Sequence, residues 1–93
     1  AYTKAKELFF AYYNNETYAE LYFSLAINLN LINEVLSSDI LIRSDNVKVH
    51  RVFFQKITNL NNLESKTIRE YLKYSVNKFP NDEYLESLFF NLD

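Results

Sequence analysis

Residues 67–93, TIREYLKYSVNKFPNDEYLESLFFNLD, decide the fold that the sequence predicts. Counted from Ile68, the first half has apolar side chains at i, i+3, i+4, i+8 and i+11, which form one stripe at the 3.6-residue period of a helix. Pro80 ends this helix, because its ring disfavours the helical conformation of the preceding residue and it has no N–H to donate. Asn81 or Asp82 then caps a second helix, which is apolar over most of its circumference. The stretch therefore predicts a helical hairpin.

Two patterns compete for the start of the first helix in this hairpin. Thr67 and Glu70 are spaced as in a capping box, in which two side chains bond the unpaired N–H groups of a helix start. Asn61 and Glu64 repeat this spacing several residues earlier. We expect the helix to begin at about residue 65, and both starts stay open.

The same unit recurs upstream in two less regular copies. A shift of 63 residues lays residues 5–30 on residues 68–93 without a gap, and seven aligned pairs are identical. A shift of 36 residues matches five further positions, namely Ile32, Glu34, Leu36, Phe53 and Phe54. Repeats of this length indicate helical units that bury their apolar faces by stacking on neighbours. The alternative is chance, because a helical chain rich in Asn, Leu and Glu produces matches at many offsets.

Composition and order agree with an all-α chain. Its 93 residues, with no Gly and one Pro, make one domain with few hairpin signals for strands. The expected helix pairs cover about 2–14/17–30, 32–43/46–60 and 65–79/82–92, which gives five to six helices. We expect stacked antiparallel hairpins, a fragment of an α-α superhelix. The chain begins inside a helix and without Met, so we expect an excerpt of a longer protein.

Apolar stripes indicate which side chains of the first two helices face the core. Phe10 and Tyr13 lie off the stripe of the first helix, and with Tyr74 and Phe90 they are the candidate contacts for a partner. The expected inner stripe of the first helix is Ala5, Leu8, Phe9 and Tyr12. That of the second is Tyr18, Leu21, Tyr22, Leu25 and Leu29, widened by Phe23, Ala26 and Ile27.

Residues 28–45 allow several interpretations. No Gly or Pro interrupts the segment, so one long helix to about Ser37 is possible. The repeat instead predicts a break near Asn30 and a short helix after it. The apolar run at residues 40–42 is also compatible with a short strand.

The charges are distributed unevenly although the net charge is only −2. Residues 46–78 carry seven Lys or Arg against two Glu, whereas the segments on either side are acidic. A basic middle segment is either the solvated face of helices or a surface that faces an anion. On the second interpretation, the candidate contacts for phosphate or RNA are Lys48, Arg51, Arg69 and Lys73.

Few residues suggest catalytic chemistry. The chain has no Cys and a single histidine, His50, which we expect at the surface or rim rather than as a base or metal ligand. Glu7, Glu34 and Glu70 recur at one position of each copy, where we expect ion pairs or solvated helix surfaces. The sequence therefore predicts no enzyme, no metal site and no cofactor. No apolar run is long enough for a membrane span, and we expect an intracellular protein, nuclear or cytoplasmic, without membrane partners.

The last hairpin resembles a known repeat family. Residues 68–72 (IREYL), residues 78–81 (KFPN) and the leucines at 85 and 88 resemble the half-a-TPR (HAT) repeat and, more loosely, the tetratricopeptide repeat. Ser75 stands at a small packing position of these repeats, whereas Leu85 replaces the usual Trp of the HAT pattern and the tetratricopeptide Gly is missing. The resemblance implies a right-handed helical solenoid that scaffolds multiprotein complexes, and HAT repeats in particular occur in RNA-processing machinery.

We therefore expect a non-catalytic protein–protein interaction scaffold whose partners are other proteins or neighbouring repeats of the same chain. The resemblance to HAT repeats implies a place in an RNA-processing complex. One alternative is a self-contained small helical bundle that acts as a regulatory or immunity-type binding protein. A second alternative is RNA binding through residues 48–78.

Overall fold

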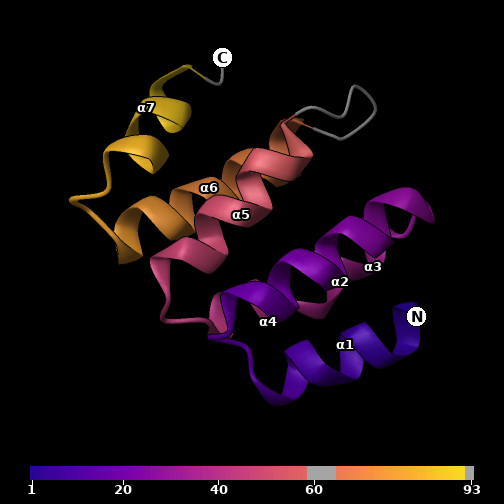
Figure 1. The fold of residues 1–93 in the computed structure, drawn as a ribbon. Coiled ribbons are helices and arrows are strands. Elements are labelled where there is room, and N and C mark those ends of the chain that lie inside the picture. Colours follow the sequence, from indigo (N-terminus) through magenta and orange to yellow (C-terminus); the bar gives the residue numbers. More distant parts are fainter. Residues whose placement is uncertain (59–64, 92–93) are drawn as a thin grey trace.

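The computed structural model describes residues 1–58 and 65–91, and within these ranges the chain forms helices and no strand (Figure 1). The all-α class is as the sequence predicts. The helices are α1 (Tyr2–Ala11), α2 (Glu16–Asn28), α3 (Ile32–Ser38), α4 (Ile40–Arg43), α5 (Val47–Ile57), α6 (Ser65–Lys78) and α7 (Glu83–Asn91). Seven helices replace the predicted five to six in this part, chiefly because the expected 32–43 helix is divided. The expected bounds at residues 59, 60 and 92 lie outside the described residues.

Side-chain caps fix the starts of three helices. Asn15 Oδ1 accepts the N–H of the third residue of α2 at 2.9 Å, and Asn46 Oδ1 accepts the N–H of the second residue of α5 at 3.0 Å. Asp82 Oδ2 accepts the N–H of the third residue of α7 at 3.0 Å. Each bond satisfies a donor that has no partner within its helix. The cap at Asp82 is one of the two that the sequence predicts.

The start of α6 differs from the predicted capping box. Thr67 lies inside the described part of α6, Ser65–Lys78, and is therefore not the residue that precedes the helix. The rival start at Asn61 and Glu64 lies outside the described residues.

The segment between α2 and α3 contains the break that the repeat predicts. Asn30 has φ 60° and therefore adopts the left-handed conformation, which ends α2. The N–H of Leu31 donates to the carbonyl of Ala26 at 2.7 Å, and that of Asn30 donates to the carbonyl of Ile27 at 3.1 Å. This pair of bonds is the Schellman motif of helix ends. The single long helix to Ser37 is therefore wrong.

A second left-handed residue divides the next helix. Asp39 has φ 56° and separates α3 from α4. Ile40 and Leu41 are buried side chains of the short helix α4, so the alternative of a strand at residues 40–42 is also wrong. Asn and Asp tolerate this conformation better than most residues, which suits a chain without glycine.

A buried apolar cluster connects the helices. Phe9 of α1, Phe23 of α2 and Phe53 of α5 contact one another in series, edge to face, with ring centroids 5.3 and 5.1 Å apart. Aromatic pairs favour this arrangement because the positive ring edge meets the negative ring face. The cluster continues through α6 as far as Leu85 of α7. It therefore holds the described part of the chain around one core.

For reference we group the helices in chain order as the first pair (α1 and α2), the second pair (α3 with α4, and α5) and the third pair (α6 and α7). Figure 1 shows α1 antiparallel to α2 and α5 beside α2, and both contacts are among the most extensive between the described helices. The first and second pairs are also joined by an ion pair of 2.6 Å between Lys6 of α1 and Glu34 of α3. Glu34 thus has the ion pair expected of the recurring glutamates.

The predicted stripes of the first two helices are buried only in part. The buried residues of α1, Ala5 and Phe9, belong to the predicted stripe, whereas Tyr12 is 60% exposed because α1 ends before it. Leu21 of α2 is 48% exposed, and Leu29, just after α2, is 54% exposed. Because α2 is apolar over most of its circumference and lies between α1 and α5, its neighbours decide which side is buried. The buried residues of α2 are Ala19, Tyr22, Phe23 and Ala26.

Candidate functional site

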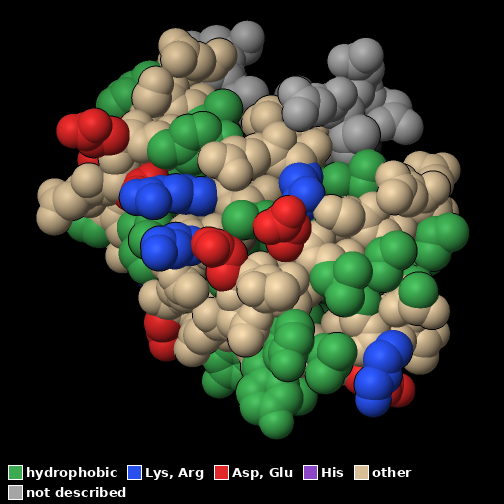
Figure 2. All heavy atoms as spheres, viewed as in Figure 1, with side chains coloured by type: hydrophobic (Ala, Val, Ile, Leu, Met, Phe, Trp, Pro, Cys, Tyr) green, Lys and Arg blue, Asp and Glu red, His purple; other side chains and the backbone are tan. Residues whose placement is uncertain are grey.

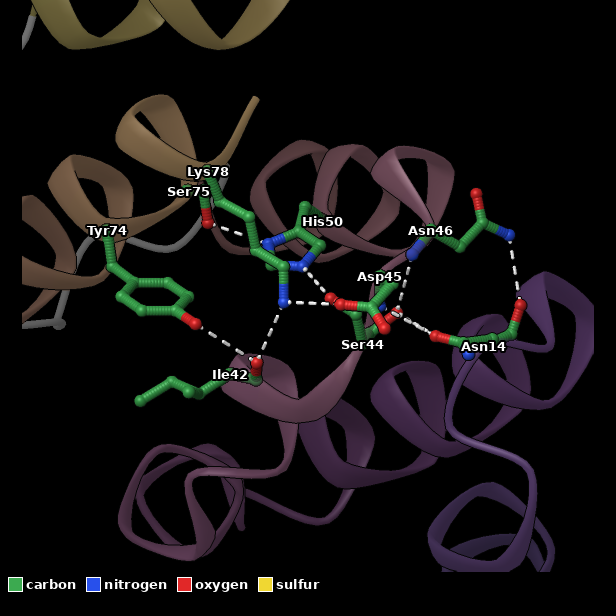
Figure 3. Close-up of polar contacts among 9 residues, drawn as sticks. All are labelled: Asn14, Ile42, Ser44, Asp45, Asn46, His50, Tyr74, Ser75 and Lys78. Carbon is green, nitrogen blue, oxygen red and sulfur yellow. Dashed lines mark hydrogen bonds and ion pairs between the residues drawn. The ribbon is translucent and has the colours of Figure 1, made fainter. Parts of the chain in front are cut away.

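A group of polar contacts connects the turn after α1, the segment before α5 and the end of α6 (Figure 3). Asn14 lies in the turn after α1, and its Oδ1 accepts the hydroxyl of Ser44 at 3.1 Å and the N–H of Asp45 at 2.7 Å. Its backbone carbonyl accepts the side-chain amide of Asn46 at 3.0 Å. One asparagine of the first turn therefore holds the segment that precedes α5.

His50 lies in this region and is fully buried, which corrects the expectation of a surface or rim position. Its Nε2 lies 2.9 Å from the carbonyl oxygen of Ser44, which can only accept, so Nε2 carries the proton. Nδ1 of the neutral ring then accepts the hydroxyl of Ser75 at 2.7 Å. Burial lowers the pKa of His50 below its ordinary value and favours this neutral form.

The sequence contains a signal for the burial of His50. It precedes Phe53 by three positions and Phe54 by four, and both are fully buried in α5. Residues with these spacings share one helix face. Ser75, the small packing residue of the repeat resemblance, is buried opposite His50.

Lys78 ties the end of α6 to the second pair. Its Nζ lies 2.8 Å from Asp45 Oδ1 and donates to the carbonyl of Ile42 at 3.2 Å. The hydroxyl of Tyr74 donates to the same carbonyl at 3.2 Å. The hydrogen bond from Lys78 lowers the pKa of Asp45, so the pair remains charged in mildly acidic solution.

Arg51, a predicted anion contact, pairs with a carboxylate instead. Its Nε donates to Asp82 Oδ1 at 2.7 Å, and a second guanidinium nitrogen donates to the same oxygen. The Asp82 side chain is only 4% exposed, whereas that of Arg51 is 40% exposed. Arg51 lowers the pKa of Asp82, and this carboxylate therefore joins α5 to the start of α7.

The other predicted anion contacts lie at the surface. Lys48 is exposed in the first turn of α5, and Arg69 and Lys73 are exposed on α6. Figure 2 shows that, on the face it displays, Lys and Arg side chains lie beside Asp and Glu side chains rather than in one basic patch.

The four predicted partner contacts divide into two groups. Phe10 and Tyr13 are partly buried against the core, and the Phe10 ring lies edge to face with Tyr22 at 5.9 Å. Tyr74 and Phe90 are 37% and 74% exposed. Sequence reasoning assigned three further exposed apolar side chains to the core, namely Tyr12, Leu21 and Leu29.

Within residues 1–58 and 65–91, no three His, Asp or Glu side chains are placed to share a metal ion. Over the same ranges, no helix combines the length and the apolar character that crossing a membrane requires. Comparison with known proteins finds no matching family model, and no curated protein or solved structure with significant similarity to the chain.

Proposed function

We propose that the chain is a non-catalytic protein–protein interaction scaffold made of helical pairs that pack on one another in series. The observation that carries the proposal is that the turn of the first pair is bonded to the turn of the second, and helix α5 of the second pair is bonded to the turn of the third. Asn14 of the first turn binds Ser44 and Asp45 before α5, and Arg51 of α5 binds Asp82 in the third turn. Repeat proteins gain stability from such contacts between neighbouring units.

The internal repeat supports the same proposal. The shift of 36 residues lays Asn46 on Asp82, and these residues cap α5 and α7 with their side chains. The shift of 63 residues lays α1, residues 2–11, on residues 65–74, which lie within α6. The turn of the first pair lies four residues earlier than this shift requires, because α2 begins at residue 16 and α7 at residue 83. The second and third pairs are thus the more similar ones.

Exposed apolar side chains provide surfaces on which a partner can dock. Figure 2 shows hydrophobic side chains at the turn between α1 and α2 and along α2. Tyr12, Leu21 and Leu29 are the exposed apolar residues of this region, and Tyr74 and Phe90 are those of the third pair. Apolar patches on a protein surface often mark interaction sites.

Affinity capture from the source cell, with and without ribonuclease, tests the proposal. We expect protein partners that withstand ribonuclease, are lost with Leu21→Ser/Leu29→Ser, and are retained with the control Asn28→Ser on the exposed face of the same helix. Membership of these partners in an RNA-processing complex would support the narrower role that the HAT resemblance implies. Partners lost on ribonuclease treatment would instead favour RNA binding through residues 48–78.

A self-contained regulatory bundle is the second candidate. The observation that favours it is the core cluster, which continues from Ala5 to Leu85 without interruption. Two results together would support the bundle and contradict the scaffold. The unaltered chain would melt as a monomer, and it would capture no protein partner that the Leu21→Ser/Leu29→Ser variant fails to capture.

A further inference from the structure

His50 joins three parts of the chain at a fully buried position. It lies on α5, bonds the carbonyl of Ser44 in the preceding segment, and bonds the hydroxyl of Ser75 on α6. Its ring also packs against that of Phe79, just beyond α6, with centroids 4.8 Å apart. His50, Ser44 and Ser75 have no exposed surface, so water cannot replace a lost partner while the helices stay in place.

The charged groups near the ring are paired with one another. No unpaired negative charge among them would stabilise a protonated His50. Lys78 of α6 and Asp45 of the segment before α5 act on His50 with opposite signs, and they form an ion pair of 2.8 Å. On α5 itself, the neighbouring Arg51 is paired with Asp82 of the third turn. Burial is the largest influence on the histidine, and it disfavours the charged form.

Protonation of His50 would therefore place an uncompensated charge between α5 and α6. It would also reverse the bond to Ser75, because Nδ1 would become a donor. The charge is relieved when the ring reaches water, which requires one of its neighbours to move away. The Phe23–Phe53 contact holds α5 against α2, with both rings fully buried, so α5 is the less easily moved of the two helices.

We propose that His50 makes the junction between α5 and α6 acid-labile, so that mild acidification releases the third pair while the first two pairs remain folded. Local opening of this kind occurs where one part of a structure costs less to open than the whole. The proposal does not depend on the scaffold function, because it concerns the junction between α5 and α6 and not the binding of a protein partner.

Amide hydrogen exchange of the full chain at about pH 7 and about pH 5, on either side of the ordinary histidine pKa, tests the proposal. After correction for intrinsic exchange, we expect protection of α6 and α7 to fall below about pH 6.5 by up to about tenfold per pH unit, which is the slope for one proton. Protection of α2 and α5 should change much less. His50→Gln keeps a donor and an acceptor without a titrating group, so its α6 and α7 should lose this response.

Titration of the His50 ring by NMR in the unaltered chain decides the question if His50→Gln does not fold. We expect the pKa of the ring to lie below its ordinary value, at the acidic end of the pH range over which α6 loses protection. Parallel loss of protection in α2 and α5 would show global unfolding and overturn the proposal. An unchanged acid response in His50→Gln, or an ordinary ring titration, would overturn it as well.

Discussion

Among residues 1–58 and 65–91 of this glycine-free chain, Asn30 and Asp39 adopt the left-handed conformation that glycine adopts most readily. Asn30 ends α2 with a Schellman motif, and Asp39 separates α3 from α4. At both positions the chain turns back onto the core. Both residues carry a side chain, whereas the left-handed conformation is sterically easiest for glycine, which has none. The backbone at these residues therefore holds strain that substitution can relieve.

We expect Asn30→Gly to raise the free energy of unfolding by about 0.5–1 kcal/mol and Asn30→Ala to lower it by about 1 kcal/mol, because only glycine avoids the steric cost of a positive φ. Chemical denaturation measures both changes. The matched control is Asn77→Gly in α6, where the backbone is helical and exposed. There the same substitution should destabilise by up to about 1 kcal/mol. If Asn30→Gly and Asn77→Gly changed the free energy of unfolding in the same direction, that result would contradict the strain assigned to Asn30.

Asp82 carries out two structural roles with one carboxylate. One oxygen pairs with Arg51 and the other caps α7. We expect Asp82→Asn to cost about 1 kcal/mol, because an amide still caps the helix but loses the partly exposed ion pair. Asp82→Ala should cost about 2–3 kcal/mol, because it removes the cap as well. Equal losses in the two variants, measured by urea unfolding, would contradict the separate roles.

Acid should remove the contribution of the Asp82 ion pair. Because Arg51 lowers the pKa of Asp82 in the folded chain below the ordinary 3.8, the pair stabilises the fold above that value. This stability is lost as the pH falls from 3.8 through the folded value. Urea unfolding over a pH series should therefore show the unaltered chain and Asp82→Asn converging at low pH. A difference in the free energy of unfolding that stays constant over the pH series would contradict the lowered pKa of Asp82.

At the scale of the element, side chains of α6 donate hydrogen bonds to backbone carbonyls near the ends of α3 and α4. The hydroxyl of Tyr71 donates to the carbonyl of Leu36 near the end of α3, and that of Tyr74 donates to the carbonyl of Ile42 near the end of α4. Burial raises the pKa of Tyr71, so its phenol stays protonated and can donate. Helix ends leave carbonyls without partners, and side chains of one face of α6 supply the donors.

We expect Tyr71→Phe to lower the free energy of unfolding by about 1–2 kcal/mol, because Tyr71 is half-buried and its hydroxyl has two acceptors, Leu36 and Asp39. Tyr74→Phe is the matched control on the same helix. Tyr74 is 37% exposed, so water can replace its bond and the cost should stay within about 0.5 kcal/mol. Thermal or chemical unfolding of both variants tests the comparison, and a reversed order would contradict it.

At the scale of the whole molecule, the series Phe9, Phe23 and Phe53 joins the first and second pairs. We expect Phe53→Ala to cost about 3–5 kcal/mol, because it leaves a cavity at a fully buried site. That loss is a large fraction of the roughly 5–14 kcal/mol available to a chain of this size. Phe90→Ser, at a side chain that is 74% exposed, should change stability by less than about 0.5 kcal/mol. Circular dichroism melts compare the two variants, and a small effect at Phe53 would contradict the assigned core.

The sequence by itself determined the helices and most of their ends. Their periodicity, the turn at Pro80 and the cap at Asn81 or Asp82 depend on residues within a few positions of one another, whereas the break near Asn30 is one of several interpretations that the sequence leaves open. Local backbone sterics and hydrogen bonds decide such features, so they can be read without knowledge of the rest of the chain.

Only the tertiary structure decided which faces are buried and how the polar residues are paired. The apolar circumference of α2 has no unique inner side, so its packing against α5 exposes Leu21 and Leu29. His50 meets Ser75, and Arg51 meets Asp82, across 25 and 31 positions of the chain. Spacing within one helix does not encode such distant pairs, because they arise from the way the helices pack.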